Sequence, residues 1–305
     1  MRVAEQIRRI ERMTGLDRTV AVLRRAVDAI PPGRFRDTLN GIPLGHPLHP
    51  VLVQVPIGSW MSAAVLDAFP GHERAAHRLV TLGIVAAAPA ALAGAVDWSH
   101  QQQRHRRVGL VHAAANTAAL GLYALSSAAR SRGRHGLGRA IGLAGLTAVG
   151  IGGLLGGHIA YSLAGGASHS DYLLDRLPGD WHDIGALHEF AEGRPVHGML
   201  GDTPIMAVRT GEEVRVLVET CGHMGGPLSR GTVADGCVTC PWHGSTFRLS
   251  DGAVMRGPAT APQPVLDVRV HDGVVSVRRP QPVATVPRQR EEAVPVEPAA
   301  PRENE

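Results

Sequence analysis

The chain has 305 residues, 44% of them hydrophobic, and a formal net charge of +4. This length is sufficient for two domains. All 31 basic residues are arginines, and many lie in the first 36 residues, which favours anionic lipid over nucleic acid as a partner. An amphipathic arm in solvent would give the same pattern. Three cysteines, two of them at metal-ligand spacing, exclude a disulfide framework.

Residues 1–40 are predicted to form an arginine-rich arm. Apolar side chains such as Ile7 and Val20 recur among the arginines at helical spacing, and a Pro-Pro-Gly run at residues 31–33 ends the pattern. This indicates one or two amphipathic helices at a membrane surface. The arm lacks the apolar run and cleavage site of a secretory signal, so we expect it to be retained uncleaved.

Four apolar stretches follow, each near the roughly 20 residues that a helix needs to cross a bilayer. They lack the polar stripe expected of a soluble bundle. The stretches cover about residues 50–69, 79–97, 108–129 and 137–164. Glycines in the last stretch allow close approach between helices in lipid. We therefore predict a four-helix transmembrane domain over residues 41–165.

The orientation of this domain follows from its arginines. An even number of spans places both chain ends on one side of the membrane. The arm and the second loop, with Arg104, Arg106 and Arg107, carry more arginines than the opposite loops. The positive-inside rule therefore predicts an inner (cytoplasmic) membrane protein whose two termini, and C-terminal domain, face the cytoplasm.

The start of the first span carries Gly45-His46-Pro47-Leu48-His49-Pro50, with Pro56-Ile57-Gly58 after it. Over about residues 40–165 the chain resembles an uncharacterised family of four-helix bacterial membrane domains, the domain of unknown function 2231 type. The resemblance implies the helical fold and no established activity.

Six polar side chains are predicted to meet near the cytoplasmic end of the bundle, where ionisable groups are costly and commonly functional. They are His46, His49, Asp97, His112, Asn116 and His158. His112 and His158 have matched depth at ~1.5 Å per residue, which suits the two axial ligands of b-type haem. Hydrogen bonds that lock helix packing explain the same residues, as does a quinone or metal site.

The residue composition and hydrophobic pattern change after the last span. Residues 166–180 are predicted to form a polar linker. Short alternating runs such as Val214 and Val216, broken by Gly and Pro, then predict an all-β domain over residues 181–280. Residues 281–305 are rich in Pro, Glu and Arg and are predicted to be disordered.

Two short arms in the β-domain carry candidate metal ligands, Cys221 with His223 and Cys240 with His243. Each arm supplies one thiolate and one imidazole, the donor set of a Rieske centre, in which thiolates hold one iron and imidazoles the other. A zinc site of two Cys and two His normally pairs Cys with Cys. A Cys237–Cys240 redox or zinc pair would leave both histidines without a role.

At these residues the chain resembles the Rieske [2Fe–2S] family, over about residues 181–279. The matching motifs are Cys-Pro-Trp-His-Gly-Ser-x-Phe at 240–247, Asp251-Gly252 and Gly257-Pro258-Ala259. The resemblance implies a small antiparallel β-sandwich with a [2Fe–2S] cluster at its tip. It also implies that the cluster ligands are Cys221, His223, Cys240 and His243.

Departures from the respiratory-chain subgroup are informative. Gly226 and Trp242 stand where that subgroup has a disulfide, and Phe247 stands where it has a tyrosine, although Ser245 matches. The centre therefore resembles the ferredoxin or ring-hydroxylase type, with a lower potential. We expect no mononuclear-iron oxygenase site, and a surface location for His182, Asp183, His188 and Glu189.

The sequence thus predicts a multidomain protein, with an N-terminal all-α four-helix transmembrane bundle and a C-terminal all-β Rieske sandwich. The predicted function is that of an electron carrier or oxidoreductase component, which passes single electrons between an unidentified donor and acceptor at the cytoplasmic membrane face. The alternative is a non-catalytic anchor or redox sensor with a structural or regulatory cluster. Lipid is the expected partner of the bundle, and a homo-oligomer is compatible with the sequence.

Overall fold

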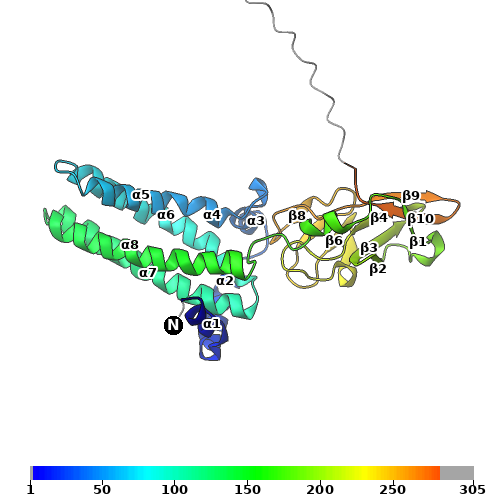
Figure 1. Cartoon of the computed structure of the whole chain (residues 1–305), viewed down its shortest axis with the longest axis horizontal. Helices are drawn as coiled ribbons and strands as arrows, with labels where there is room; N and C mark the ends of the chain where they lie inside the picture. Colours follow the sequence, from blue (N-terminus) through cyan, green and yellow to red (C-terminus); the bar gives the residue numbers. More distant parts are fainter. Residues whose placement is uncertain (1–2, 282–305) are drawn as a thin grey trace, which may run out of the picture.

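The computed structural model describes residues 3–281. A helical half and a β half lie end to end along the longest axis of the molecule (Figure 1). The predicted disordered tail, residues 281–305, lies outside the described residues except for Gln281.

The helical half contains eight α-helices and ends in a π-helical turn, η3. These are α1 (Val3–Arg12), α2 (Asp17–Asp28), α3 (Arg34–Asn40), α4 (Leu48–Leu52), α5 (Gln54–Leu66), α6 (Glu73–Ser99), α7 (Gln103–Ser131), α8 (His135–Gly157) and η3 (His158–Ser162). Four helical segments among the described residues are long and apolar enough to cross a membrane: Leu48–Leu66, Glu73–Ser99, Gln103–Ser131 and His135–Ser162. The prediction of an N-terminal all-α bundle with four membrane-length helices is confirmed.

Small residues bring α7 and α8 together. Tyr123 of α7 stacks on Trp60 of α5 at 4.1 Å between ring centroids. A Cβ on Gly145 of α8 would lie 3.0 Å from the Tyr123 ring, so a side chain at this position would press against the aromatic pair. The glycines of the last span therefore serve close helix packing, as expected for helices in lipid.

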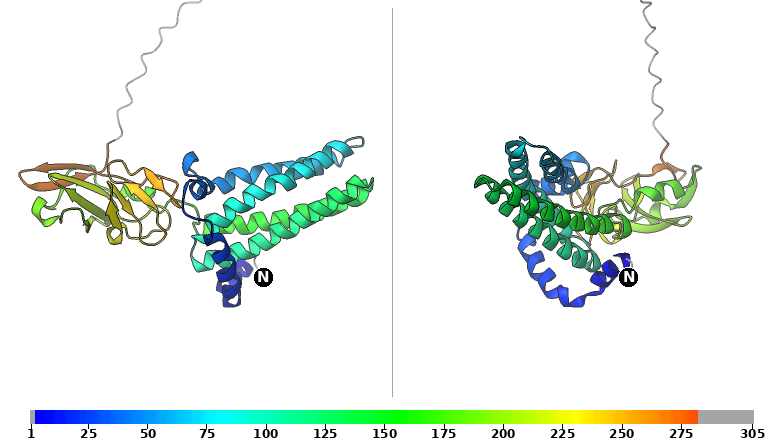
Figure 2. Two further views of the ribbon diagram at one scale, coloured as in Figure 1. Left: turned by 180° about the vertical axis from the view of Figure 1, so that it is seen from behind. Right: turned by 60° about the vertical axis from the view of Figure 1, so that its left-hand side comes forward.

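The N-terminal helices pack against protein at the end of the bundle nearest the β half (Figure 2). Asp17, at the start of α2, accepts hydrogen bonds at 2.7 Å from Arg107 Nε and from Gln103 Nε2 of α7. Glu11 of α1 lies 2.9 Å from His158 Nε2. These contacts fix the arm across the bundle end.

The β half consists of three antiparallel sheets. The first has the order β1 (His182–Ala186), β10 (Val274–Arg278), β9 (Asp267–His271), and the second the order β2 (Pro195–Leu200), β3 (Thr203–Thr210), β4 (Glu213–Val218). The third has the order β5 (Thr232–Ala234), β6 (Cys237–Thr239), β7 (Thr246–Arg248), β8 (Val254–Arg256). The predicted all-β sandwich is confirmed.

The segment predicted as a polar linker is packed rather than free. It contains a 3₁₀ helix at Asp171–Arg176, and Leu173 and Leu177 are buried in the core of the β half. The His169 N–H donates a 2.8 Å hydrogen bond to the Gly222 carbonyl. The connection between the halves is therefore fastened to the β-domain.

A second contact joins the halves directly. Asp37 of α3 accepts a 3.2 Å hydrogen bond from the Gly257 N–H and pairs with Arg256 Nε at 2.9 Å. A Cβ on Gly257 would lie 2.8 Å from side-chain atoms of Asn40 and Ile42, so the loop after β8 rests tightly on α3. The tip of the β half is thereby held against the bundle.

Candidate metal centre

Two loops of similar form make up the tip of the β half. The first follows β4, and its Cys221 N–H donates to the Gly226 carbonyl at 2.9 Å. The second joins β6 to β7, and its Cys240 N–H donates to the Ser245 carbonyl at 2.8 Å. Each loop is closed by a glycine in the left-handed region, with φ of +76° and +78°: Gly225 and Gly244. Loops of this form aim both cysteines and both histidines at one place.

The sulfur ends of the two loops meet inside the tip. Cys221 is 1% exposed and Cys240 is 3% exposed, and both belong to an apolar cluster. The two thiol groups interact with one another. This contact and burial raise the pKa of Cys221, while the same contact lowers the pKa of Cys240. Backbone N–H groups of His223 and Trp242 also point at these sulfurs and favour the thiolate forms.

The imidazoles of His223 and His243 lie side by side on the outer side of the tip, with centroids 5.0 Å apart and planes at 87°. The Nδ1 atom of His223 is buried and has no hydrogen-bond partner among the described residues. Burial of an unpartnered polar atom is unfavourable unless a ligand meets it. His105 also has a buried nitrogen without a partner. The nitrogen of His223 differs because it lies at the tip beside the three other candidate ligands.

This donor set fits a binuclear cluster better than a single ion. Among the described residues, no three His, Cys, Asp or Glu side chains converge closely enough to hold one metal ion. A zinc site would require such convergence. Two irons bridged by sulfide allow the thiols and the imidazoles to serve different metals. The two thiols and two imidazoles therefore provide a donor set that fits a [2Fe–2S] cluster.

Gln263, which the sequence analysis missed, braces the first loop. It is 1% exposed, and its Oε1 accepts a 3.0 Å hydrogen bond from the Gly222 N–H. Its Nε2 donates to the carbonyls of Val218 at 2.7 Å and Thr220 at 2.8 Å. The residue stands in a proline-flanked run without any motif, so only the fold identifies it.

The residues behind the second loop are where the sequence departs from the respiratory-chain subgroup. Ser245 is fully buried, and its Oγ accepts a 2.9 Å hydrogen bond from the Ala259 N–H. Phe247 is also fully buried and offers no hydroxyl. A Cβ on Gly226 would lie 2.8 Å from Cys240 Sγ. All three cysteines are free, with Cys237 on β6.

The imidazole side of the tip faces the bundle. The ring of His100, directly after α6, lies 6.1 Å from that of His223 and 6.3 Å from that of His243, with interplanar angles of 84° and 69°. Burial and the neighbouring Arg36 lower the pKa of His100 to about 4. Burial, then His243 and His100, lower the pKa of His223 well below its ordinary value. Burial therefore favours the neutral forms of His100 and His223.

The structure does not bring the proposed haem ligands together. His112 Nδ1 donates to the Gly152 carbonyl at 2.7 Å, and Asn116 Nδ2 lies 3.2 Å from its Nε2. His158 instead pairs with Glu11. On α8, Gly156 is the position that faces His112, and His158 follows it by two residues. Two residues correspond to about 200° around a helix. His158 therefore points away from His112, and haem gains no support.

The other predicted bundle residues are arranged differently from the prediction. His49, rather than His158, lies near His112, at 6.4 Å between ring centroids, and its Nδ1 donates to the Ala90 carbonyl at 2.8 Å. The side chains of His46 and Asp97 make no hydrogen bond within residues 3–281. The four residues at the start of the β-domain, His182, Asp183, His188 and Glu189, are exposed as expected.

Comparison with known families identifies both halves. Residues 180–277 match the family model described as Rieske [2Fe-2S] domain, and residues 45–169 match that described as Predicted membrane protein (DUF2231). Both resemblances inferred from the sequence are confirmed.

Individual relatives match the β half. The anthranilate 1,2-dioxygenase ferredoxin subunit of Burkholderia cepacia is 39% identical over 98 residues, which cover 32% of this chain and 91% of the relative. Ferredoxin CarAc of Metapseudomonas resinovorans is 33% identical over 78 residues, which cover 26% of this chain and 73% of the relative. The solved structure of the ferredoxin of carbazole 1,9a-dioxygenase from Nocardioides aromaticivorans IC177 is 24% identical, with a TM-score of 0.31. The match covers 32% of this chain and 95% of that ferredoxin.

Proposed function

Taking as premise that this chain belongs to the Rieske [2Fe–2S] family, we propose that it is a membrane-anchored carrier of single electrons. Its Rieske domain is homologous to ferredoxin subunits of dioxygenase systems, which implies electron transfer. The observation that carries the proposal is the tip itself, where two buried thiols and two imidazoles meet and one imidazole nitrogen is left without a partner.

Each ligand residue has a distinct task in this proposal. Cys221 and Cys240 would hold one iron and His223 and His243 the other, and the cluster would supply one-electron redox chemistry at this place. Burial of the cysteines excludes water from the sulfur side. Backbone N–H groups aimed at the sulfurs stabilise negative charge there. The brace from Gln263 keeps the first loop from moving when the charge changes.

The bundle supplies the anchor. Four helices of membrane length, together with the arginines of the arm and second loop, support an inner-membrane protein with a cytoplasmic Rieske domain. Electrons would then pass between an unidentified donor and acceptor at that face. Reporter fusions to the C-terminus test the orientation, because alkaline phosphatase activity there would contradict it.

The alternative function, a redox sensor or anchor with a structural cluster, is favoured by one observation. The imidazole side of the tip lies against His100 of the bundle rather than in solvent. A sensor would lose its cluster on oxidation, whereas a carrier returns to its starting state. Repeated redox cycling of the purified protein distinguishes the two.

The experiment that tests the carrier uses the full chain in detergent. We expect two irons per chain, a Rieske electron paramagnetic resonance signal on reduction, and a potential in the lower part of the range of roughly −150 to +300 mV. Zinc in place of iron would contradict the cluster. A potential near the top of the range would contradict the interpretation of Gly226, Trp242 and Phe247.

A further inference from the structure

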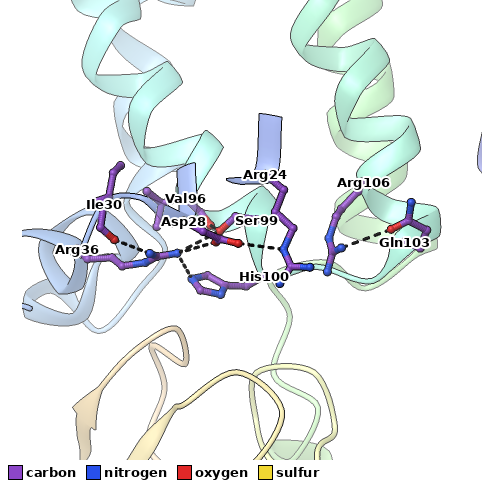
Figure 3. Close-up of polar contacts among 9 residues, drawn as sticks. All are labelled: Arg24, Asp28, Ile30, Arg36, Val96, Ser99, His100, Gln103 and Arg106. Carbon is purple, nitrogen blue, oxygen red and sulfur yellow. Dashed lines mark hydrogen bonds and ion pairs between the residues drawn. The ribbon is translucent and has the colours of Figure 1, made fainter. Parts of the chain in front are cut away.

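The end of the bundle that faces the tip carries a group of cationic side chains. Figure 3 shows Arg24 of α2, Arg36 of α3 and Arg106 of α7 on the bundle side of the loops, with His100 among them. We call these three arginines and His100 the arginine layer. It adjoins the candidate cluster on the side of the imidazoles, because His100 lies about equally far from the rings of His223 and His243.

Arg36 is the fixed centre of the arginine layer. It is 8% exposed, and its Nη1 donates to the Ile30 carbonyl at 2.7 Å. Its Nη2 lies 3.2 Å from His100 Nε2 and 3.3 Å from Ser99 Oγ. Because a guanidinium only donates, His100 Nε2 accepts. The contact locks the ring of His100 against the tip as a neutral imidazole.

The charges in the arginine layer do not cancel. Asp28 contacts both Arg24, at 3.2 Å, and Arg36, at 3.4 Å, so one carboxylate serves two guanidinium groups. Arg106 pairs with no carboxylate among the described residues: its Nη1 reaches the neutral Gln103 at 3.4 Å, and its Nε is buried without a partner. Three positive charges thus face one negative charge.

Figure 3 shows the side chains of Arg24 and Arg106 next to one another at the bundle end, above the loops of the tip. The layer adjoins the candidate ligands through His100, whose ring lies 6.1 Å from that of His223 and 6.3 Å from that of His243. A half-buried cation without a counter-charge is unfavourable. One-electron reduction would add a negative charge to the cluster. This charge would lie beside the arginine layer, in which one carboxylate faces three guanidinium groups.

We propose that the arginine layer of the bundle is the counter-charge for the reduced cluster, so that docking of the two halves makes the cluster easier to reduce. This rests on the proposed function and assigns the bundle a part in it besides anchorage. Arg24, Arg36 and Arg106 are positioning residues in this scheme, because they act on the cluster through its field and through His100. Charge near a cluster is one of the determinants of its potential.

The test measures the midpoint potential of the full chain in detergent by redox-poised electron paramagnetic resonance. We expect Arg106→Gln and Arg24→Gln each to lower the equilibrium constant for reduction about tenfold, which is about 59 mV for one electron. The matched control is Arg25→Gln, the next residue on the exposed surface of α2, which should change the constant less than twofold. Equal shifts in Arg106→Gln, Arg24→Gln and Arg25→Gln would overturn the assignment to this layer.

An uncharged variant tests the role of docking separately. Gly257→Leu places a side chain where Asn40 and Ile42 already stand, and it should separate the halves without altering any charge. We expect a lower potential, and a smaller further effect of Arg106→Gln in that background. An intact Rieske signal with unshifted potentials in all variants would refute this proposal alone. Absence of any Rieske signal from the unmodified protein would instead refute the proposed function.

Discussion

Histidines at the tip of the β half and in the bundle were both predicted from sequence to be candidate cofactor ligands. In the structure the two groups differ in their hydrogen bonds. At the tip of the β half, His223 keeps a buried nitrogen for which the described residues provide no partner. In the bundle, His112 makes hydrogen bonds through both ring nitrogens, and His158 pairs with a carboxylate of α1. Of these three histidines, the candidate ligand at the tip is the one with a buried ring nitrogen that has no partner among the described residues. His105 of α7 also has such a nitrogen, so the lack of a partner points to a ligand site only where further donors lie beside it.

Removal of a ligand at the tip should have the largest effect. We expect Cys221→Ser and His223→Ala to abolish the Rieske absorbance and resonance signals, because the neighbouring imidazole of His100 is engaged by Arg36 and the remaining thiol, Cys237, lies outside the two loops. The control is Cys237→Ser, which removes a free thiol outside the two loops. Its iron content should remain that of the unmodified protein. A retained signal in His223→Ala would show that the orphaned nitrogen is not a ligand.

Removal of a satisfied histidine in the bundle should affect stability and leave the cluster intact. His112→Ala leaves the Gly152 carbonyl without its donor, which we expect to cost about 1–3 kcal/mol of unfolding free energy. Thr117→Ala on the same helix, where an exposed hydroxyl donates to the Ala113 carbonyl one turn earlier, is the control and should cost less. Thermal unfolding in detergent measures both. A Soret band in protein expressed with haem, lost in His112→Ala, would reverse the comparison.

The smallest expected effect concerns the attachment of the arm. Hydrogen bonds from Arg107 and Gln103 lower the pKa of Asp17 from 3.8 to about 2. Between these values the unfolded arm binds more protons than the docked arm, so docking weakens as the pH falls. We expect protection of α1 and α2 from proteolysis above about pH 4, declining toward pH 2, and absent in Asp17→Asn across that range. A pH-independent protection would show that apolar contacts alone hold the arm.

Local patterns were sufficient to predict the two halves of the fold. Apolar runs of membrane length predicted the spans, and the alternation of Val214 and Val216 with polar residues predicted β4, in which both valines are buried. The mixed Cys and His arms predicted the candidate donors because their chemistry is local to two short loops. These features depend on neighbours in sequence.

Features that depend on contacts between distant segments could not be predicted. The haem pair was chosen by depth along the helices, which takes no account of direction around them, and α8 passes into a π-helical turn at His158 itself. The hydrogen bond that His158 Nε2 donates to the Glu11 carboxylate joins residues 147 positions apart. Gln263 and the arginine layer carry no motif, because their partners are chosen by the tertiary fold.

The packed connection between the halves has a consequence for how partners find the cluster. Leu173 and Leu177 pack it into the β core, and the His169 N–H donates to the Gly222 carbonyl. The connection is therefore a rigid link and not a flexible tether. In the proposed membrane-anchored carrier, this rigid connection would hold the redox centre at a constant height above the bilayer. A partner anchored in the same membrane would then search for the centre in two dimensions.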